Sequence, residues 1–115
     1  MAAWSSGENP RAALGVLREV VRLSPTNELY ETELGNAARD SGKSSTNPVE
    51  RVAYFQEAWR AADGQVNHHP RNPDAWNNRG VAAMWLTQLA GIDQMLAARQ
   101  SFERAVTLDP VFVDA

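Results

Sequence analysis

Three prolines, Pro25, Pro70 and Pro110, stand within related stretches of sequence, and this repetition is what most limits the fold. The positions twelve, eight and five residues before each proline carry small or apolar residues, with one exception before Pro70. These residues are Ala13, Leu17 and Val20 before the first proline, Ala58, Ala62 and Gln65 before the second, and Ala98, Phe102 and Ala105 before the third. A chain of such units stacks them side by side, because each unit needs its neighbours to cover its apolar face.

The repetition continues beyond the prolines, since Gly35 and Gly80 each stand ten residues after one of them. Because the register holds on both sides, we expect each proline to end one helix and to lead the chain into the next unit. The units are long and unequal: Pro25 and Pro70 are 45 residues apart, and Pro70 and Pro110 are 40 apart.

Asparagine-proline pairs predict where helices begin. The pairs are Asn9-Pro10, Asn47-Pro48 and Asn72-Pro73. Each places a capping side chain directly before a residue whose fixed φ angle suits the first helical turn. We expect a fourth start near Thr26 or Asn27 and a fifth at Asp93, in a turn-like stretch. About five helices joined by short loops are therefore predicted, with Ser41 to Thr46 as the most flexible connection.

Apolar residues recur at steps of three and four, which is the period of a helix with one buried face. They are Val52, Phe55, Trp59, Ala62 and Val66 after Pro48, Leu14, Leu17, Val20, Val21 and Leu23 in the first helix, and Leu96, Ala98, Phe102, Ala105, Val106 and Leu108 in the last. The strict alternation of a half-buried β-strand does not occur in the sequence. The predicted fold class is all-α.

The unit from Asn72 to Pro110 carries the fullest version of the pattern. It contains Asn72-Pro73-Asp74-Ala75-Trp76-Asn77-Asn78-Arg79-Gly80, followed by Ala98, Phe102, Ala105, Leu108, Asp109 and Pro110, and Leu34-Gly35 and Gly42 repeat part of it. This unit resembles a tetratricopeptide repeat (TPR). The resemblance implies a right-handed α-solenoid of antiparallel helix hairpins. Residues 1–25 would then be a partial repeat, 26–70 and 71–110 two repeats, and 111–115 the start of a further one.

In such a stack, small residues let paired helices approach closely while large ones fill the space between them. We expect Gly35, Gly80, Ala98 and Ala105 in the first role, and Trp76 and Phe102 in the second. The proline spacings exceed the usual TPR length of about 34 residues. The surplus should lie in longer helices or a longer loop within each hairpin. Such extended repeats are loosely similar to those in soluble tails of bacterial membrane-embedded glycan ligases and polymerases.

Charge and composition disfavour several functions. Eleven basic and fourteen acidic residues give a net charge of -3, too weak and too mixed for the clustered phosphate contacts of nucleic-acid binding. No apolar run is long enough to cross a bilayer, so we expect no membrane contact by this segment. The chain has no cysteine, which leaves its compartment open. Both ends are expected to continue into further repeats or domains.

His68 and His69 are the only histidines, and they raise the question of a metal site. Adjacent helical residues point about 100° apart and chelate one ion poorly, so we expect both at a helix C-terminus instead. The carboxylate pairs Glu31 with Glu33 and Asp109 with Asp114 are expected to be solvated rather than to act as acid and base. The sequence predicts no enzyme activity and no cofactor.

The TPR resemblance implies a concave face lined by the first helix of each repeat. Its residues would be Thr32, Glu33, Asn36, Arg39 and Asp40 from one repeat, and Asp74, Asn77, Asn78, Val81 and Trp85 from the next. Side-chain amides suit the backbone of an extended peptide, since each both donates and accepts. The alternative is that these are merely solvated polar residues. Trp85 is either a ligand anchor or a side chain that packs against its own hairpin.

Two asparagines, Asn36 and Asn78, match places where chaperone-binding TPR domains hold a carboxyl terminus. Thr32 and Asp114 stand where such a clamp has lysines, which argues against it. The leading hypothesis is a non-catalytic scaffold segment that binds a partner peptide or helix. The alternative is a soluble TPR tail of a bacterial membrane-embedded O-antigen ligase or polymerase. A third, weaker one is a metal-dependent enzyme centred on His68 and His69.

Overall fold

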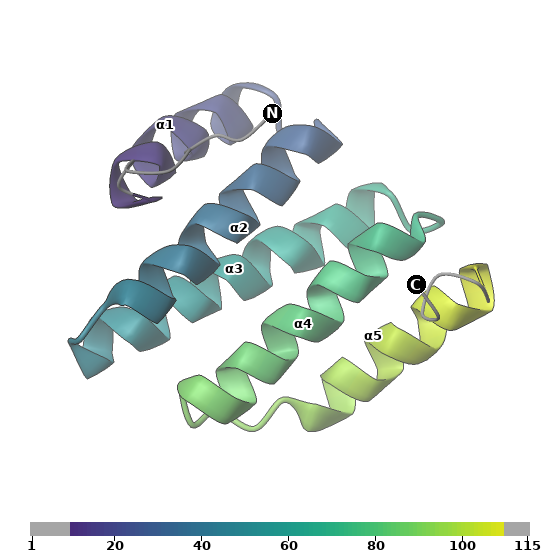
Figure 1. Cartoon of the computed structure of the whole chain (residues 1–115). Coiled ribbons are helices and arrows are strands. Elements are labelled where there is room, and N and C mark those ends of the chain that lie inside the picture. Colours follow the sequence, from purple (N-terminus) through teal and green to yellow (C-terminus); the bar gives the residue numbers. More distant parts are fainter. Residues whose placement is uncertain (1–9, 110–115) are drawn as a thin grey trace.

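The computed structural model describes residues 10–109, and all its regular secondary structure in that range is helical. The helices are α1 (Pro10–Leu23), α2 (Glu28–Ser44), α3 (Pro48–His68), α4 (Pro73–Leu89) and α5 (Met95–Leu108) (Figure 1). The all-α class and the expected number of helices are thereby confirmed for the described residues. The expected cap Asn9 and the segment 111–115 lie outside them.

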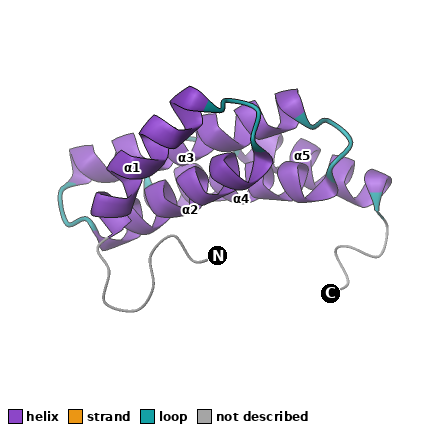
Figure 2. Ribbon diagram, turned by 90° about the horizontal axis from the view of Figure 1, so that it is seen from above, coloured by secondary structure: helices purple, strands orange, loops and turns teal. Residues whose placement is uncertain are grey.

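Each helix packs mainly against the next helix in the chain. The main contacts join α1 to α2, α2 to α3, α3 to α4 and α4 to α5, while α2 and α4 touch over a much smaller area. Viewed from above, α2 and α4 lie along one side of the molecule, and α1, α3 and α5 along the other (Figure 2). The helices α2 and α4 are therefore neighbours on one face, and α3 lies behind them in the view of Figure 1.

Asparagine caps begin three of the helices, as the sequence predicts. Asn47 Oδ1 accepts hydrogen bonds from the N–H groups of Val49 and Glu50, at 2.9 and 3.2 Å. Asn72 caps α4 in the same way, and Asn27 caps α2 by accepting from the N–H of Tyr30. These bonds satisfy donors that would have no partner in the first helical turn.

The expectation of a flexible connection from Ser41 to Thr46 is wrong. Helix α2 continues to Ser44, and both Ser41 and Gly42 are buried. The ring of Phe55 lies against Gly42, where a Cβ atom would come within 3.1 Å of the ring. Burial of this ring therefore keeps a glycine- and serine-rich stretch helical, and only residues 45–47 connect α2 to α3.

The last helix begins two residues later than expected. Gly91 has a φ of +73°, and α5 starts at Met95 rather than at Asp93. The Asp93 carboxylate accepts the N–H of Met95 at 3.2 Å, and Thr87 Oγ1 accepts the N–H of Gln94 at 2.8 Å. Asp93 thus stabilises the helix start from outside the helix.

The helix faces follow the apolar pattern, with three corrections. Leu14, Leu17, Leu34, Ala37, Ala38 and Ala58 form one buried cluster that joins α1, α2 and α3. By contrast, Leu23, Leu96 and Val106 are exposed, although the pattern places them on the buried stripes. Each of these three lies on an outer helix, α1 or α5, which the described residues cover on one side only.

The surplus length of the repeats lies largely in the helices. Helix α2 has 17 residues and α3 has 21, with only residues 45–47 between them. In the second hairpin α4 has 17 and α5 has 14, joined by residues 90–94. The expectation of longer helices is thus confirmed most clearly for residues 26–70.

Close helix approach occurs at one of the two expected glycines. A Cβ atom on Gly80 would lie 2.7 Å from Phe102 Cε1, so α4 and α5 need glycine there. A Cβ atom on Gly35 would meet Ala61 Cβ at 3.7 Å, which is an ordinary contact. At Gly35 the packing of α2 against α3 therefore has room for a methyl group and does not require glycine itself. Trp76 is only partly buried, and its indole N–H donates to the carbonyl oxygen of Pro70 at 2.8 Å.

Candidate binding groove

A groove lies between α2 and α4, and α3 forms its floor. Its lining residues are Glu31, Thr32, Gly35, Asn36 and Arg39 from α2, Ala58, Ala62 and Gln65 from α3, and Asn78, Val81, Ala82 and Trp85 from α4. It holds about 40 Å³ of space. One water-sized group needs roughly 10–15 Å³ of such space, so the hollow takes in a few atoms of a ligand, and the rest of the ligand would lie over its open rim.

Six of the ten residues expected on the concave face line this groove. They are Thr32, Asn36, Arg39, Asn78, Val81 and Trp85. Of the others, Glu33 and Asn77 are half-buried outside the lining, and Asp74 is exposed in the first turn of α4. Asp40 contacts Arg39, with 3.3 Å between Oδ1 and Nε. The structure thus brings polar residues of α2 and α4 together along one groove.

Gln65 organises the polar end of the groove. Its side chain is 1% exposed, and its Nε2 donates to Thr32 Oγ1 at 2.7 Å. Its Oε1 accepts from Asn78 Nδ2 at 3.3 Å. A buried amide in α3 therefore connects α2 with α4 and orients two of the predicted residues. In the sequence Gln65 stands out only as the weakest member of the repeat pattern, because a polar residue replaces a small or apolar one there.

Glu31 is buried, which contradicts the expectation of a solvated carboxylate. The residue is 4% exposed, and its Oε2 lies 3.0 Å from His68 Nδ1. Its Oε1 has no hydrogen-bond partner among the described residues, although His69 Nε2 is 3.9 Å away. An unpartnered buried acceptor costs free energy, so this carboxylate is an unusual feature of the groove wall.

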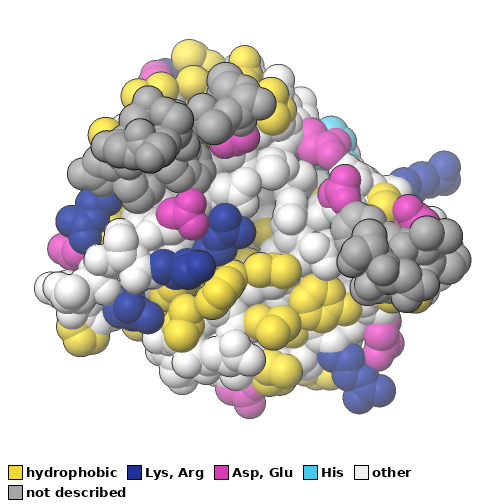
Figure 3. Space-filling model, viewed as in Figure 1, with side chains coloured by type: hydrophobic (Ala, Val, Ile, Leu, Met, Phe, Trp, Pro, Cys, Tyr) yellow, Lys and Arg dark blue, Asp and Glu magenta, His cyan; other side chains and the backbone are white. Residues whose placement is uncertain are grey.

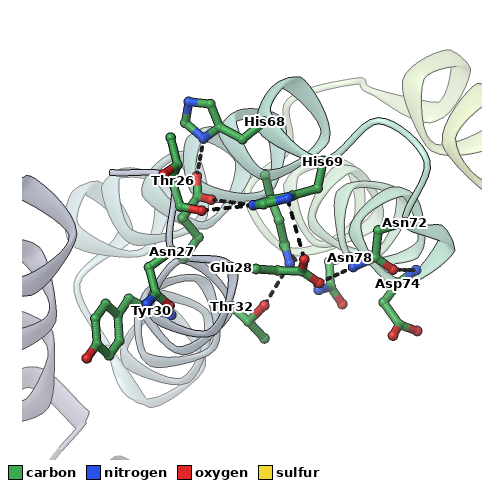
Figure 4. A network of polar contacts seen from close by, with 12 residues as sticks. Thr26, Asn27, Glu28, Tyr30, Thr32, His68, His69, Asn72, Asp74 and Asn78 are labelled. Carbon is green, nitrogen blue, oxygen red and sulfur yellow. Dashed lines mark hydrogen bonds and ion pairs between the residues drawn. The ribbon is translucent and has the colours of Figure 1, made fainter. Parts of the chain in front are cut away.

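Both histidines end α3 as predicted, and they hold the start of α2. The helix ends at His68, and the N–H of His69 donates to the carbonyl oxygen of Gln65 at 2.8 Å. His69 Nε2 is 2.9 Å from the Thr26 carbonyl oxygen, and its Nδ1 is 3.6 Å from Glu28 Oε2 (Figure 4). Within residues 10–109, no group of three histidine, aspartate, glutamate or cysteine side chains could hold a metal ion.

Trp85 packs across the junction between the two hairpins. Its ring stacks on Phe55 of α3, with the ring centroids 6.3 Å apart and the planes at 12°. From the sequence, Trp85 was expected either to anchor a ligand or to pack against its own hairpin. Neither interpretation describes this stacking, because Phe55 belongs to the preceding hairpin. Trp85 nevertheless remains partly exposed and lines the groove. Its buried Nε1 has no hydrogen-bond partner among the described residues.

Two cations lie at the Trp85 end of the groove. Lys43 Nζ is 4.9 Å from the centroid of the Trp85 ring, within the range of a cation–π contact. Arg39 lines the groove one helical turn before Lys43. Near the centre of the view in Figure 3, Lys and Arg side chains lie directly beside hydrophobic ones where α2 and α4 run side by side. One end of the groove is therefore rich in amides and the other is cationic and aromatic.

No protein-family model matches the chain, and no curated protein matches it significantly. None of the described helices combines the length and the low polarity that a membrane span requires.

Proposed function

We propose that this chain is part of a TPR-like right-handed α-solenoid that binds a partner peptide or helix in the groove between α2 and α4. The observation that carries the proposal is the groove itself. Two helices one repeat apart contribute amide, cationic and aromatic side chains to one narrow surface. Aromatic and arginine side chains carry much of the energy at protein interfaces, and amides suit a peptide backbone.

The consecutive packing of the helices supports the solenoid part of this proposal. In a solenoid each unit contacts its neighbours along the chain, and first helices align on one face. The order of contacts from α1 to α5 follows that rule, and α2 and α4 lie on one side of the molecule, as first helices of adjacent repeats would. The exposed apolar residues of α1 and α5 fit outer units that further repeats would cover.

Peptide selection followed by NMR mapping tests the proposal. Peptides that bind the purified chain would be selected from a random displayed library and titrated into ¹⁵N-labelled protein. We expect the largest shift changes at backbone amides of α2 and α4 along the groove. Peptides that bind only to the outer faces of α1 or α5 would contradict the proposal.

The groove variant Asn36→Ala supplies the matching affinity test. Asn36 is the better choice because Asn78 donates to the buried Gln65 and its loss would disturb the interior. Asn67→Ala is the control, since Asn67 is an exposed residue of α3 outside the groove lining. Selected peptides should bind Asn36→Ala more weakly and Asn67→Ala unchanged. Equal affinity of the peptides for both variants would contradict the proposal that they bind in the groove.

A further inference from the structure

Gly35 is not required by the packing of α2. A Cβ atom there would lie 3.7 Å from Ala61 Cβ and 3.9 Å from the Ala58 carbonyl oxygen, both ordinary distances. Glycine within a helix is less favourable than alanine, because it loses more backbone entropy on folding. The structure thus holds a destabilising residue that the helix interface does not need, which calls for another reason.

The groove supplies that reason, because Gly35 lies in its lining among other small residues. Ala58, Ala62 and Ala82 line the groove with it. A glycine without a side chain lets another backbone approach closely. From Glu31 to Arg39 the α2 wall rises about 12 Å at 1.5 Å per residue. An extended peptide covers that distance in roughly four residues at 3.3 Å each.

A second observation at the groove points to a ligand that donates hydrogen bonds. Glu31 is 4% exposed and lines the groove, and its Oε1 has no hydrogen-bond partner among the described residues. Oε1 lies 3.9 Å from His69 Nε2, beyond hydrogen-bond distance, so a backbone N–H of a ligand could satisfy this acceptor. A passing peptide strand carries such donors at regular intervals.

The charges at the opposite end of the groove identify the side chain that such a peptide would present. Arg39 Nε lies 3.3 Å from Asp40 Oδ1, and the guanidinium has further donors on its terminal nitrogens. Lys43 is exposed and lies over Trp85. Residues 39–43 of α2 thus carry two cations and one carboxylate next to an aromatic ring, and the surplus positive charge favours an acidic group.

We propose that the groove binds an extended peptide whose backbone passes over Gly35 and whose glutamate or aspartate side chain pairs with Arg39 and Lys43 beside Trp85. This inference rests on the proposed function and specifies the chemistry of its partner. We take the acidic group to be an internal side chain rather than a carboxyl terminus, because a strand that lies along α2 from Glu31 to Arg39 would present side chains at the cationic end.

A matched peptide set tests the charge. Three probes are eight-residue peptides, acetylated and amidated at their ends, in which apolar residues alternate with glutamate, with glutamine or with lysine. The fourth probe is the glutamine peptide with a free carboxyl terminus. We expect the glutamate peptide to bind about tenfold more tightly than the amidated glutamine peptide at low salt, with a smaller ratio at high salt. Equal or tighter binding of the glutamine or lysine peptides would overturn the inference. Preference for the free carboxyl terminus would also overturn it, in favour of a terminal clamp.

Charge reversal on the protein is the reciprocal test. Lys43→Glu should remove the preference for the glutamate peptide, whereas Arg60→Glu should preserve it. Arg60 is an exposed cation of α3 outside the groove lining, so the two variants have the same net charge. An unchanged preference in Lys43→Glu would contradict the inference.

Gly35→Ala tests the path of the backbone without risk to the fold. The variant should bind the glutamate peptide about tenfold more weakly, because its methyl group occupies the place of the peptide backbone, while its melting temperature stays the same or rises. Gly15→Ala is the control, since nothing lies within 4 Å of a Cβ atom at that exposed position of α1. Unchanged affinity in Gly35→Ala would refute the proposed path. If library-selected peptides bind the groove while these probes do not, the inference fails and the proposed function stands; if neither binds, both fail.

Discussion

The hairpins α2–α3 and α4–α5 both pack an aromatic ring against a glycine, but they use glycines at different positions of the repeat. In the second hairpin Phe102 lies against Gly80, ten residues after Pro70. In the first hairpin Phe55 lies against Gly42, while Gly35, ten residues after Pro25, has room for a Cβ atom. The first hairpin, in which only the second helix is longer than its counterpart, therefore makes its close contact nearer to the loop. A register shared in sequence is not always a register shared in packing.

A second difference lies one residue before the repeated glycines. Leu34 belongs to the apolar cluster shared by α1, α2 and α3. Its counterpart Arg79 joins α3, α4 and α5 through polar contacts: Nε donates to Asp63 Oδ1 at 3.0 Å, and an amino group donates to Ser101 Oγ at 2.8 Å. The guanidinium also lies 4.6 Å from the centroid of the Trp59 ring. Equivalent places in the two units thus use apolar burial in one case and a charged network in the other.

The largest effect should come from the two aromatic rings. Phe55 is fully buried and should cost about 3–5 kcal/mol of unfolding free energy when replaced by alanine. Phe102 is partly exposed, so Phe102→Ala should cost less. Urea unfolding of both variants measures the difference. A larger loss of unfolding free energy for Phe102→Ala than for Phe55→Ala would contradict this expectation.

Replacing Gly80 by leucine should force α4 and α5 apart. The Phe102 ring already occupies the place of a Cβ atom, so overpacking should cost about 1–3 kcal/mol or more. Thermal unfolding followed by circular dichroism measures the loss. An unaltered melting temperature would show that the second hairpin does not need its glycine.

The substitution Arg79→Leu would give the second unit the residue that the first unit has at the same position, Leu34. The change leaves Asp63 without this partner and removes a charged hydrogen bond to the buried Ser101, at a cost of about 1–3 kcal/mol. Arg99→Leu is the control, because the Arg99–Glu103 pair is exposed on α5 and should contribute at most about 0.5 kcal/mol. Equal chemical denaturation midpoints for the two variants would mean that the polar network does not stabilise the second hairpin.

The smallest effect is expected at Gly35. Gly35→Ala should leave stability unchanged or raise it by up to about 1 kcal/mol, whereas Gly42→Ala should lower it, because a Cβ atom would press on Phe55. Differential scanning calorimetry of the pair decides the matter. A higher stability of Gly42→Ala would contradict the view that α2 and α3 approach most closely where Phe55 lies against Gly42.

Local residue patterns sufficed for the class, the number of helices and most of their starts. Asparagine caps such as Asn47 and Asn72 act within one helical turn, so they can be recognised without knowledge of the tertiary structure. The TPR resemblance named ten residues of one surface, and six of them line the groove, because α2 and α4 lie on the same side of the molecule.

The tertiary structure alone decided which glycine meets a ring, which carboxylate is buried and what orients the groove. Gly42 was expected in a flexible loop, Glu31 in solvent, and Gln65 drew attention only as a flaw in the pattern. Each of these depends on a residue at least 13 positions away, namely Phe55, His68 or Asn78. The distance between two such side chains is set by where helices cross, and helix crossing depends on the packing of all their neighbours.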